Sequence, residues 1–315
     1  MHFLSTIAAC MRQLLPDLVV AGMSRCLFAG ETLEDAVRCV RLLNAEGFSA
    51  TLDYLGDAPL RGDEARTMAE PYMDLIDAIE RNNLDAEAAI KVSGLGATEK
   101  ECRSIERVES IIAWAGRGNV VVRIDMEDVR LAHGRLDATE QWPGKYRNVS
   151  FALRAGVPHT YSVLASFARQ RSAAGINNVM HQETPVRLVA GTVGSRDELS
   201  SYFLHHVERC FEADLFVTIA THDENLIDQV VARSLRRGVE RGRFEFQVAL
   251  GMREEVRGRL RQMGFRVRVY VPFGKNRNGY SNRILNEHPD AIWRGIGSLF
   301  LNPARVEHNR RSVRQ

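Results

Sequence analysis

The sequence predicts an α/β protein whose main body is a (β/α)8 barrel of the TIM type, preceded by N-terminal helices. Eight short runs rich in apolar residues recur along the chain, and each is typical of a buried strand. Roughly 14 to 35 residues separate consecutive runs, which is room for one crossover helix each time. No GxGxxG turn or P-loop is present, which argues against an open doubly wound sheet. At 315 residues the chain is long enough for one barrel of this kind.

We expect three parts along the chain: a helical segment at residues 1–30, a catalytic barrel at residues 31–300, and a basic tail at residues 301–315. The opening sequence MHFLSTIAAC has no basic n-region, and Arg12 and Asp17 follow it. These features favour a helix over a signal peptide or a membrane span. The tail is short, so we interpret it as solvated rather than as an arm that binds nucleic acid.

The first helix and strand follow residue 31. Thr32 is placed as the N-cap of the helix, and Asp35 stands at the capping-box spacing. Gly47 ends the helix, whose apolar face carries Ala36, Val37, Val40 and Leu43. The strand that follows is expected to end near Asp53, with Asp57 just beyond it.

Seven further runs complete the expected barrel. The segments EEVRGRLRQMG and NLIDQVVARSLRRG illustrate the helices between them. In the fourth run, HTYSVL, the strand pattern is diluted by Pro158, His159 and Tyr161. The expected strands cover residues 89–93, 120–125, 159–164, 186–189, 215–220, 244–250 and 265–271.

The last of these strands alternates valines with polar residues. In a barrel the valines would pack outward against helices and the polar residues would face the lumen. The other interpretation is an edge strand with one solvated face. The outward set is Val267, Val269 and Val271, and the inward set is Arg266, Arg268 and Tyr270.

A short helix is expected after this strand. Tyr280, Arg283 and Glu287 fall at i, i+3 and i+7, so they share one helical face. An aromatic ring, a guanidinium and a carboxylate just past the C-terminal end of a strand form a candidate clamp for a small anion.

The composition argues against several kinds of function. Lys and Arg number 42 against 40 Asp and Glu, so the charge offers no case for nucleic-acid binding. The five cysteines are scattered without CxxC spacing, which argues against a zinc site and a disulfide framework and favours a reducing cytoplasm. They are Cys10, Cys26, Cys39, Cys102 and Cys210.

Polar residues gather in or just after the expected strands. Because TIM barrels hold their active sites at the C-terminal ends of the strands, this recurrence points to a catalytic site. For any single residue, a buried structural ion pair remains the alternative. The set is Asp53, Asp57, Lys91, Asp125, Arg187, Thr221, His222, Gln247 and Tyr270.

Metal and nucleophilic chemistry find no support in the motifs. His222 has no second histidine or cysteine at ligand spacing, so no metal is expected. Asp223 and Asn225 are candidates to cap the following helix instead. No GxSxG motif and no recognisable Cys–His motif occurs.

Several strings together resemble the proline dehydrogenase family, and they occur in that family's order from about residue 28 to 290. This resemblance implies a distorted (β/α)8 barrel that binds FAD. It also implies oxidation of L-proline to pyrroline-5-carboxylate by hydride transfer to the flavin. The strings are AGETLEDAVRCVRLLNAEGFSATLDYLGD, VRIDMED, VRLVAG, ATHDENLI, FEFQVALGMRE and RVRVYVPFG, with the helix that carries Tyr280, Arg283 and Glu287.

The resemblance implies roles for residues on the flavin side. Lys91 would lie beside the reactive edge of the flavin, and Asp125 and Tyr270 would wall the substrate pocket. These three are the expected catalytic residues. The expected FAD-binding residues are Arg187, Thr221, His222 and Gln247.

It also implies an amino acid or amine substrate, held at one end of the pocket. Arg283 would bind the substrate carboxylate, Tyr280 would pack on its ring, and Glu287 would support the helix. Asp57 stands where the family has a glutamate that closes a gate by pairing with a carboxylate-binding arginine. The electron acceptor would be a quinone or another carrier, reached through peripheral contact with a membrane.

Four departures from the family pattern bear on the substrate and the flavin. Ile284 replaces the second of two adjacent arginines, which should weaken carboxylate binding by about 2 to 4 kcal/mol. Ala190 replaces a lysine, Ala165 replaces a flavin-contacting glutamine on the fourth strand, and KNRNG replaces an aromatic and proline approach to the last helix. These changes favour a related cyclic or secondary amine. An ordinary catabolic enzyme and an inactive binding or regulatory barrel are the alternatives.

Overall fold

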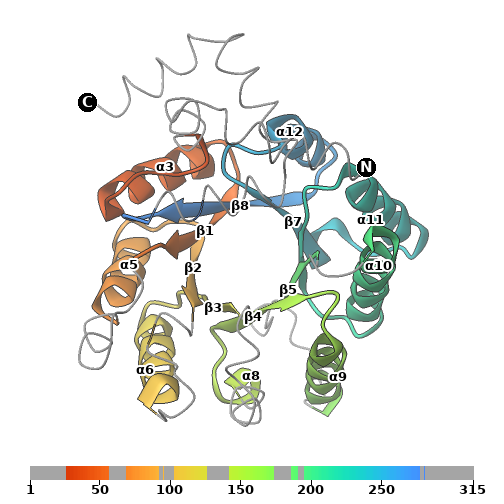
Figure 1. The fold of residues 1–315 in the computed structure, drawn as a ribbon, viewed down its shortest axis with the longest axis horizontal. Helices are drawn as coiled ribbons and strands as arrows, with labels where there is room; N and C mark the ends of the chain where they lie inside the picture. Colours follow the sequence, from red (N-terminus) through yellow and green to blue (C-terminus); the bar gives the residue numbers. More distant parts are fainter. Residues whose placement is uncertain are drawn as a thin grey trace.

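Eight parallel strands close into a barrel in the computed structural model, confirming the expected fold class. The structure describes residues 26–56, 69–91, 95, 103–125, 142–173, 186–190, 195–276 and 280. Each strand pairs with the next, and β1 pairs with β8 to complete the ring. The helices lie around the outside of this ring (Figure 1). The expected N-terminal helical segment up to residue 25 and the expected C-terminal tail lie outside the described residues.

The strands match the expected runs in seven of eight places. Their bounds are β1 Ser49–Tyr54, β2 Ala86–Lys91, β3 Val122–Asp125, β4 Val149–Arg154, β5 Val186–Val189, β6 Val217–Ala220, β7 Phe244–Ala249 and β8 Arg266–Phe273. The helices are α3 Leu33–Ala45, α5 Glu70–Arg81, α6 Arg103–Arg117, α8 Trp142–Lys145, α9 Pro158–Ala173, α10 Arg196–Glu212, α11 Glu224–Arg236 and α12 Glu254–Gln262, with a 3₁₀ turn η2 at Arg241–Arg243.

The prediction for the fourth strand was wrong. Residues 159–164 lie inside helix α9. The fourth strand is β4, which begins at Val149, ten residues before the expected start. Pro158 is the first residue of α9, where a proline is favourable because its missing N–H has no helical partner. The proline that diluted the strand pattern was therefore a signal for a helix start.

Strand β2 begins three residues earlier than expected, at Ala86. The segment AEAA lacks the β-branched and aromatic residues that usually mark a strand. Glu87 is buried in the lumen, where it pairs with Arg123 of β3. The tertiary ion pair thus stabilises a strand that local propensity does not indicate.

The first helix, α3, has the predicted caps. The Thr32 hydroxyl accepts a hydrogen bond from the Asp35 N–H at 3.2 Å, and an Asp35 carboxylate oxygen accepts one from the Thr32 N–H at 3.2 Å. After the helix, Gly47 has φ +80, and a Cβ there would meet the Arg261 guanidinium at 2.7 Å. The four predicted apolar residues of the helix are all buried.

The main hydrophobic core lies between the outer face of the barrel and the helices. Val267, Val269 and Val271 of β8 belong to it, as predicted. Arg268 and Tyr270 are buried in the lumen, but Arg266 is exposed at the start of the strand, where its guanidinium lies 5.0 Å from the Phe216 ring centre. None of the helices in the described ranges is long and apolar enough to cross a membrane.

Candidate active site

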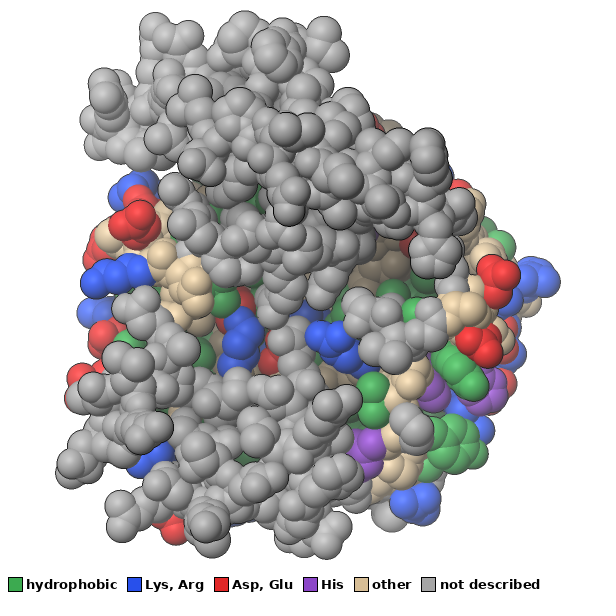
Figure 2. Space-filling view, in the orientation of Figure 1, with side chains coloured by type: hydrophobic (Ala, Val, Ile, Leu, Met, Phe, Trp, Pro, Cys, Tyr) green, Lys and Arg blue, Asp and Glu red, His purple; other side chains and the backbone are tan. Residues whose placement is uncertain are grey.

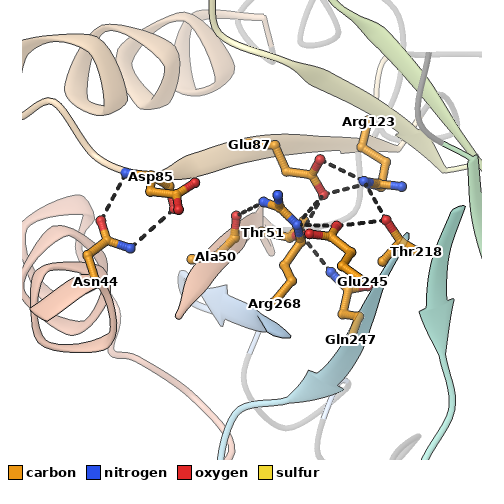
Figure 3. A network of polar contacts seen from close by, with 10 residues as sticks. All are labelled: Asn44, Ala50, Thr51, Asp85, Glu87, Arg123, Thr218, Glu245, Gln247 and Arg268. Carbon is orange, nitrogen blue, oxygen red and sulfur yellow. Dashed lines mark hydrogen bonds and ion pairs between the residues drawn. The ribbon is translucent and has the colours of Figure 1, made fainter. Parts of the chain in front are cut away.

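Inward-facing polar side chains fill the barrel in two layers, because alternate residues of each strand point into the lumen. We call the layer nearer the start of the strands the lower tier: Thr51, Glu87, Arg123, Thr218, Glu245 and Arg268. We call the other layer, in which Lys91 and Asp125 are the last residues of their strands, the upper tier: Asp53, Lys91, Asp125, Arg187 and Tyr270. Gln247 of β7 is bonded to the lower tier through Thr51. Figure 3 shows the lower tier together with Gln247.

The lower tier is a closed network of charges. Arg123 donates to both carboxylate oxygens of Glu87, from Nε at 2.5 Å and from Nη2 at 2.7 Å. Arg268 donates from Nε to Glu245 at 2.6 Å and from Nη1 to the Ala50 carbonyl at 2.7 Å. Such bidentate and charge-assisted bonds are the strongest hydrogen bonds that side chains make. We call this network the floor of the barrel.

Opposite charges outweigh burial in setting the pKa values of this network. Burial alone would raise the pKa of Glu87, but the nearby Arg123 and Arg268 guanidinium groups lower it to about 2. Burial alone would lower the pKa of Arg268, but Glu245 and Glu87 raise it above the usual range. Both groups are therefore charged at neutral pH.

Asp53, at the end of β1, is the centre of the upper tier. Its carboxylate is fully buried. Lys91 of β2 donates from Nζ to Asp53 Oδ2 at 2.5 Å, and the Tyr270 hydroxyl of β8 donates to the same oxygen. Asp53 Oδ1 is buried and makes no hydrogen bond to any described residue. The tier therefore holds one buried acceptor atom that a ligand could use.

Tyr270 is held as a neutral phenol. Burial raises its pKa well above the usual value of 10, and the Asp53 carboxylate raises it further. The hydroxyl therefore donates a hydrogen bond across the accessible pH range.

Aromatic rings continue from Tyr270 toward the mouth of the barrel. Tyr280 stacks on Tyr270 with 6.3 Å between ring centres and 22° between ring planes. Phe28 packs on Tyr280 at 6.4 Å, and the Arg187 guanidinium lies 5.1 Å from the Tyr270 ring centre. Leu27, Ala249 and Met252 complete this small apolar cluster.

The structure thus brings five of the predicted residues to one place. Lys91, Tyr270, Arg187 and Tyr280 are linked by the contacts above, and Asp125 stands beside Lys91 in the pairing of β2 with β3. Charged side chains of both signs lie at the centre of this face of the molecule (Figure 2). The catalytic and cofactor roles of these residues stay predictions.

The predicted site residues after β6 lie in the loop that leads into α11. The Thr221 hydroxyl accepts a hydrogen bond from the Asp223 N–H at 3.2 Å within its own loop. Asp223 caps α11, accepting from the Asn225 N–H at 2.9 Å, so Asp223 confirms the predicted cap while Asn225 supplies only its backbone. His222 lies between them, half-buried. Gln247 lies deeper, bonded to Thr51.

Three predicted substrate residues, Asp57, Arg283 and Glu287, lie outside the described residues, as does Ile284. Ala190 directly follows β5, where its N–H donates to the Ala220 carbonyl at 3.4 Å. Ala165 is a residue of α9, so its interpretation as a lost flavin contact on the fourth strand was wrong.

The sequence reasoning noted Asp53 at a strand end but assigned it no role, and of the lower tier it predicted only Arg268 to face the lumen. The signal was present as charged residues at alternate positions of otherwise apolar strands, as in AEAAIK, VRID and FEFQVA. In the described ranges no group of three or more His, Cys, Asp or Glu side chains could hold a metal ion.

Comparison with known proteins identifies the family of the chain. The family model described as "Proline dehydrogenase" matches residues 36–192 and 194–281. Proline dehydrogenase 1 of Bacillus subtilis subsp. natto is 28% identical over 274 residues, covering 84% of this chain and 87% of that protein. Proline dehydrogenase of Deinococcus radiodurans is 30% identical over 275 residues, covering 83% and 84%.

Solved structures share the fold. Proline utilization A (PutA) from Bdellovibrio bacteriovorus has a TM-score of 0.72 at 18% identity, covering 90% of this chain and 33% of that one. PutA from Corynebacterium freiburgense has a TM-score of 0.71 at 18% identity, covering 93% and 34%. The chain thus spans about a third of these PutA proteins. From the family model that matches most of its length, together with its closed barrel, we conclude that the chain belongs to the proline dehydrogenase family.

Proposed function

We propose that the protein is an FAD-dependent dehydrogenase that oxidises L-proline, or a related cyclic or secondary amine, by hydride transfer to the flavin. The observation that carries this proposal is the upper tier. Two cations, Lys91 of β2 and Arg187 of β5, and a neutral phenol, Tyr270 of β8, are linked through Asp53 Oδ2 and the Tyr270 ring. Lys91 is the last residue of β2, at the C-terminal end of the barrel strands. That end of a TIM barrel is where active sites lie, and the chain belongs to a family of proline dehydrogenases.

The upper tier fits a flavin. The isoalloxazine ring has flat apolar faces and a polar edge on which N–H and C=O groups alternate. Arg187 and Gln247 offer planar hydrogen-bonding groups for such an edge, and the stacked rings of Tyr270 and Tyr280 offer a flat wall. The buried Asp53 Oδ1 atom is an acceptor for a ligand N–H group.

When bound, FAD would supply the hydride acceptor. The protein would orient the reactants and stabilise charge. Lys91 is half-buried and its ammonium is fixed by Asp53, so its positive charge is held in place before any ligand arrives. A preorganised charge of this kind costs no reorganisation during a reaction. Tyr270, neutral because of its raised pKa, would wall the substrate pocket with Asp125.

For the substrate, we propose a carboxylate bound by Arg283, a ring packed on Tyr280, and support from Glu287 and the gate residue Asp57. A guanidinium fork suits an α-carboxylate. Ile284 removes a second cation from this group. That observation favours a relative of proline with a weaker need for two carboxylate donors.

We propose a quinone or a comparable carrier as the acceptor of the electrons, with a cytoplasmic protein that contacts the membrane peripherally. The family resemblance supports this part.

Flavin absorbance and anaerobic reduction test the proposed function. Purified protein should be yellow, and L-proline or a cyclic secondary amine should bleach its flavin in the absence of oxygen. A colourless protein that FAD cannot reconstitute would support an inactive binding or regulatory barrel instead. Rapid bleaching at modest L-proline concentration would identify an ordinary proline dehydrogenase and defeat the altered-substrate proposal.

The variant Ile284→Arg tests the carboxylate clamp. Restoring a second guanidinium should raise L-proline affinity by roughly 30-fold or more, since one donor to a charged carboxylate contributes about 2 kcal/mol or more. The concentration of L-proline that gives half-maximal bleaching measures this affinity. An unchanged value would count against a clamp at Arg283, while bleaching itself would still support the flavin enzyme.

A further inference from the structure

The Gln247 side chain of β7 is hydrogen-bonded to the lower tier. Its amide Nε2 donates to the Thr51 hydroxyl oxygen at 2.7 Å, and the Thr51 hydroxyl donates to Glu87 Oε1 at 2.5 Å (Figure 3). Glu87 in turn is held by Arg123 from both of its oxygens. All four side chains are buried. They form one continuous chain of hydrogen bonds from a fixed ion pair to the amide.

The direction of every hydrogen in this chain is determined. Glu87 is ionised, because Arg123 and Arg268 lower its pKa to about 2 although burial opposes them, so its carboxylate can only accept. The short contact between Thr51 and Glu87 must therefore contain the single hydroxyl hydrogen of Thr51. The Thr51 oxygen is left with lone pairs alone, so the atom that contacts it at 2.7 Å must be the amide nitrogen of Gln247.

We propose that Thr51 is a positioning residue for the cofactor site, and that it orients the Gln247 amide with its nitrogen toward the floor and its oxygen toward the flavin. This inference rests on the proposed function and deepens it. An amide oxygen that faces the ligand can take only a hydrogen-bond donor. On the polar edge of an isoalloxazine ring the donor is the N3–H group, which we assign as the partner of Gln247 Oε1.

This chain of hydrogen bonds also explains why the Gln247 side chain needs an anchor. An amide is nearly symmetric in shape, so a free Gln247 could turn over and present NH₂ to N3–H, placing two donors against each other. Anchoring by Thr51 and the ionised Glu87 removes that orientation. If Gln247 turned over, a buried amide group would be left without a hydrogen-bond partner, which is unfavourable.

Thr218 of β6 provides a matched control. Like Thr51 it is fully buried in the lower tier and its hydroxyl donates to a glutamate, Glu245 Oε1, at 2.8 Å. It makes no hydrogen bond to Gln247 among the described contacts; its other partner is Arg123, at 3.4 Å. Thr218→Val thus removes an equivalent floor hydroxyl without releasing the amide.

The test measures FAD binding to apo-protein by quenching of flavin fluorescence, with urea unfolding as the measure of stability. Thr51→Val should weaken FAD binding at least 10-fold, whereas Thr51→Ser, which keeps the hydroxyl, should stay within about 3-fold of wild type. Thr218→Val should lose a comparable amount of stability and also stay within about 3-fold in FAD affinity. Equal FAD affinities in Thr51→Val and Thr218→Val would overturn the assignment.

A double-mutant cycle isolates the route through the amide. In a Gln247→Met background, which has no amide to orient, adding Thr51→Val should change FAD affinity by less than about 3-fold. If Thr51→Val weakens FAD binding in the Gln247→Met background as much as it does in wild type, Thr51 acts on FAD by another route. If Thr51→Val does not fold, the Gln247→Met variant tests the proposal instead. An FAD affinity equal to that of wild type would exclude any contact between the Gln247 amide and the cofactor.

Failure of this inference is distinguishable from failure of the proposed function. Wild-type protein that takes up no FAD would overturn the proposed function, and the assignment of Thr51 with it. Wild-type protein that binds FAD, with Thr51→Val unchanged, would overturn the assignment alone.

Discussion

At the scale of single residues, one carboxylate oxygen organises the upper tier. Asp53 Oδ2 accepts from the Lys91 ammonium and from the Tyr270 hydroxyl, and both donors come from other strands. Charge-assisted bonds of this kind are about twice as strong as neutral ones. The position of the Lys91 charge and the orientation of the Tyr270 hydroxyl therefore depend on a residue that need not touch the substrate.

Asp53→Asn tests this dependence. The substitution keeps the shape of the side chain but removes its charge, so Lys91 loses its anchoring partner. We expect the rate of anaerobic flavin reduction by substrate to fall roughly 100-fold, the scale on which one preorganised electrostatic group contributes. Stopped-flow absorbance measures that rate.

Asp85→Asn is the matched control, because Asp85 is exposed at the beginning of β2, where its backbone contacts Asn44. This variant should reduce its flavin at the wild-type rate. If Asp53→Asn also keeps the wild-type rate, the Lys91 charge does not need its anchor.

At the scale of elements, helix caps and turns determine where each strand enters the barrel. The capping box of α3 begins the helix that leads into β1, and Gly47, with its positive φ, makes the turn between them. Asp223 caps α11 and thereby holds the loop with Thr221 and His222 at the end of β6. The residues expected to bind FAD there are placed by a cap.

Thr32→Ala should lower the free energy of unfolding by about 1 kcal/mol, since it leaves the Asp35 N–H without its acceptor. Thr32→Ser keeps the hydroxyl and should change the stability by only a few tenths of a kcal/mol. Urea unfolding followed by circular dichroism measures both. A Thr32→Ala protein as stable as wild type would show that the cap contributes nothing in the intact barrel.

At the scale of the whole molecule, the lower tier joins strands β1, β2, β3, β6, β7 and β8 across the lumen. Most barrels of this type fill that space with branched apolar side chains. Here ion pairs fill it, and removing one partner would leave an uncompensated buried charge. The fold of this protein therefore depends on the charge state of its interior.

Acid should destabilise the protein through Glu87. Its pKa is about 2 in the folded protein and 4.5 as the ordinary value, so between these values the unfolded chain binds a proton that the folded protein does not. The stability that Glu87 contributes is complete above pH 4.5 and is lost as the pH falls toward 2. Urea unfolding at pH 7, 4.5 and 3 measures the slope.

Glu87→Gln should be less stable than wild type at pH 7, because Arg123 and Arg268 lose their carboxylate partner, but its stability should fall less between pH 4.5 and pH 3. Glu240→Gln, at an exposed glutamate, serves as control and should keep the wild-type slope. Identical slopes for Glu87→Gln and wild type would place the acid-sensitive group elsewhere.

The local patterns of the sequence were sufficient for most of the fold. Short runs rich in apolar residues located seven strands, and the capping box located the start of α3, because both signals depend on neighbours within a few residues. Strand β4 was misplaced although its residues VSFALR alternate, because the run HTYSVL after Pro158 also carries β-branched and aromatic residues, and that run lies in α9. The same reasoning found the upper-tier residues Lys91, Arg187 and Tyr270 as polar groups in or just after the expected strands.

What the sequence alone determined is therefore the barrel, its family resemblance and the kinds of group at its mouth. Only the tertiary structure decided which groups are partners. Asp53 and Lys91 are 38 residues apart, Thr51 and Gln247 are 196 apart, and Asp53 and Tyr270 are 217 apart. The physical reason is strand pairing: β1 lies directly beside β2, which brings Lys91 to Asp53. Closure of the ring, in which β1 meets β8, brings Gln247 and Tyr270 within hydrogen-bonding distance of β1 residues.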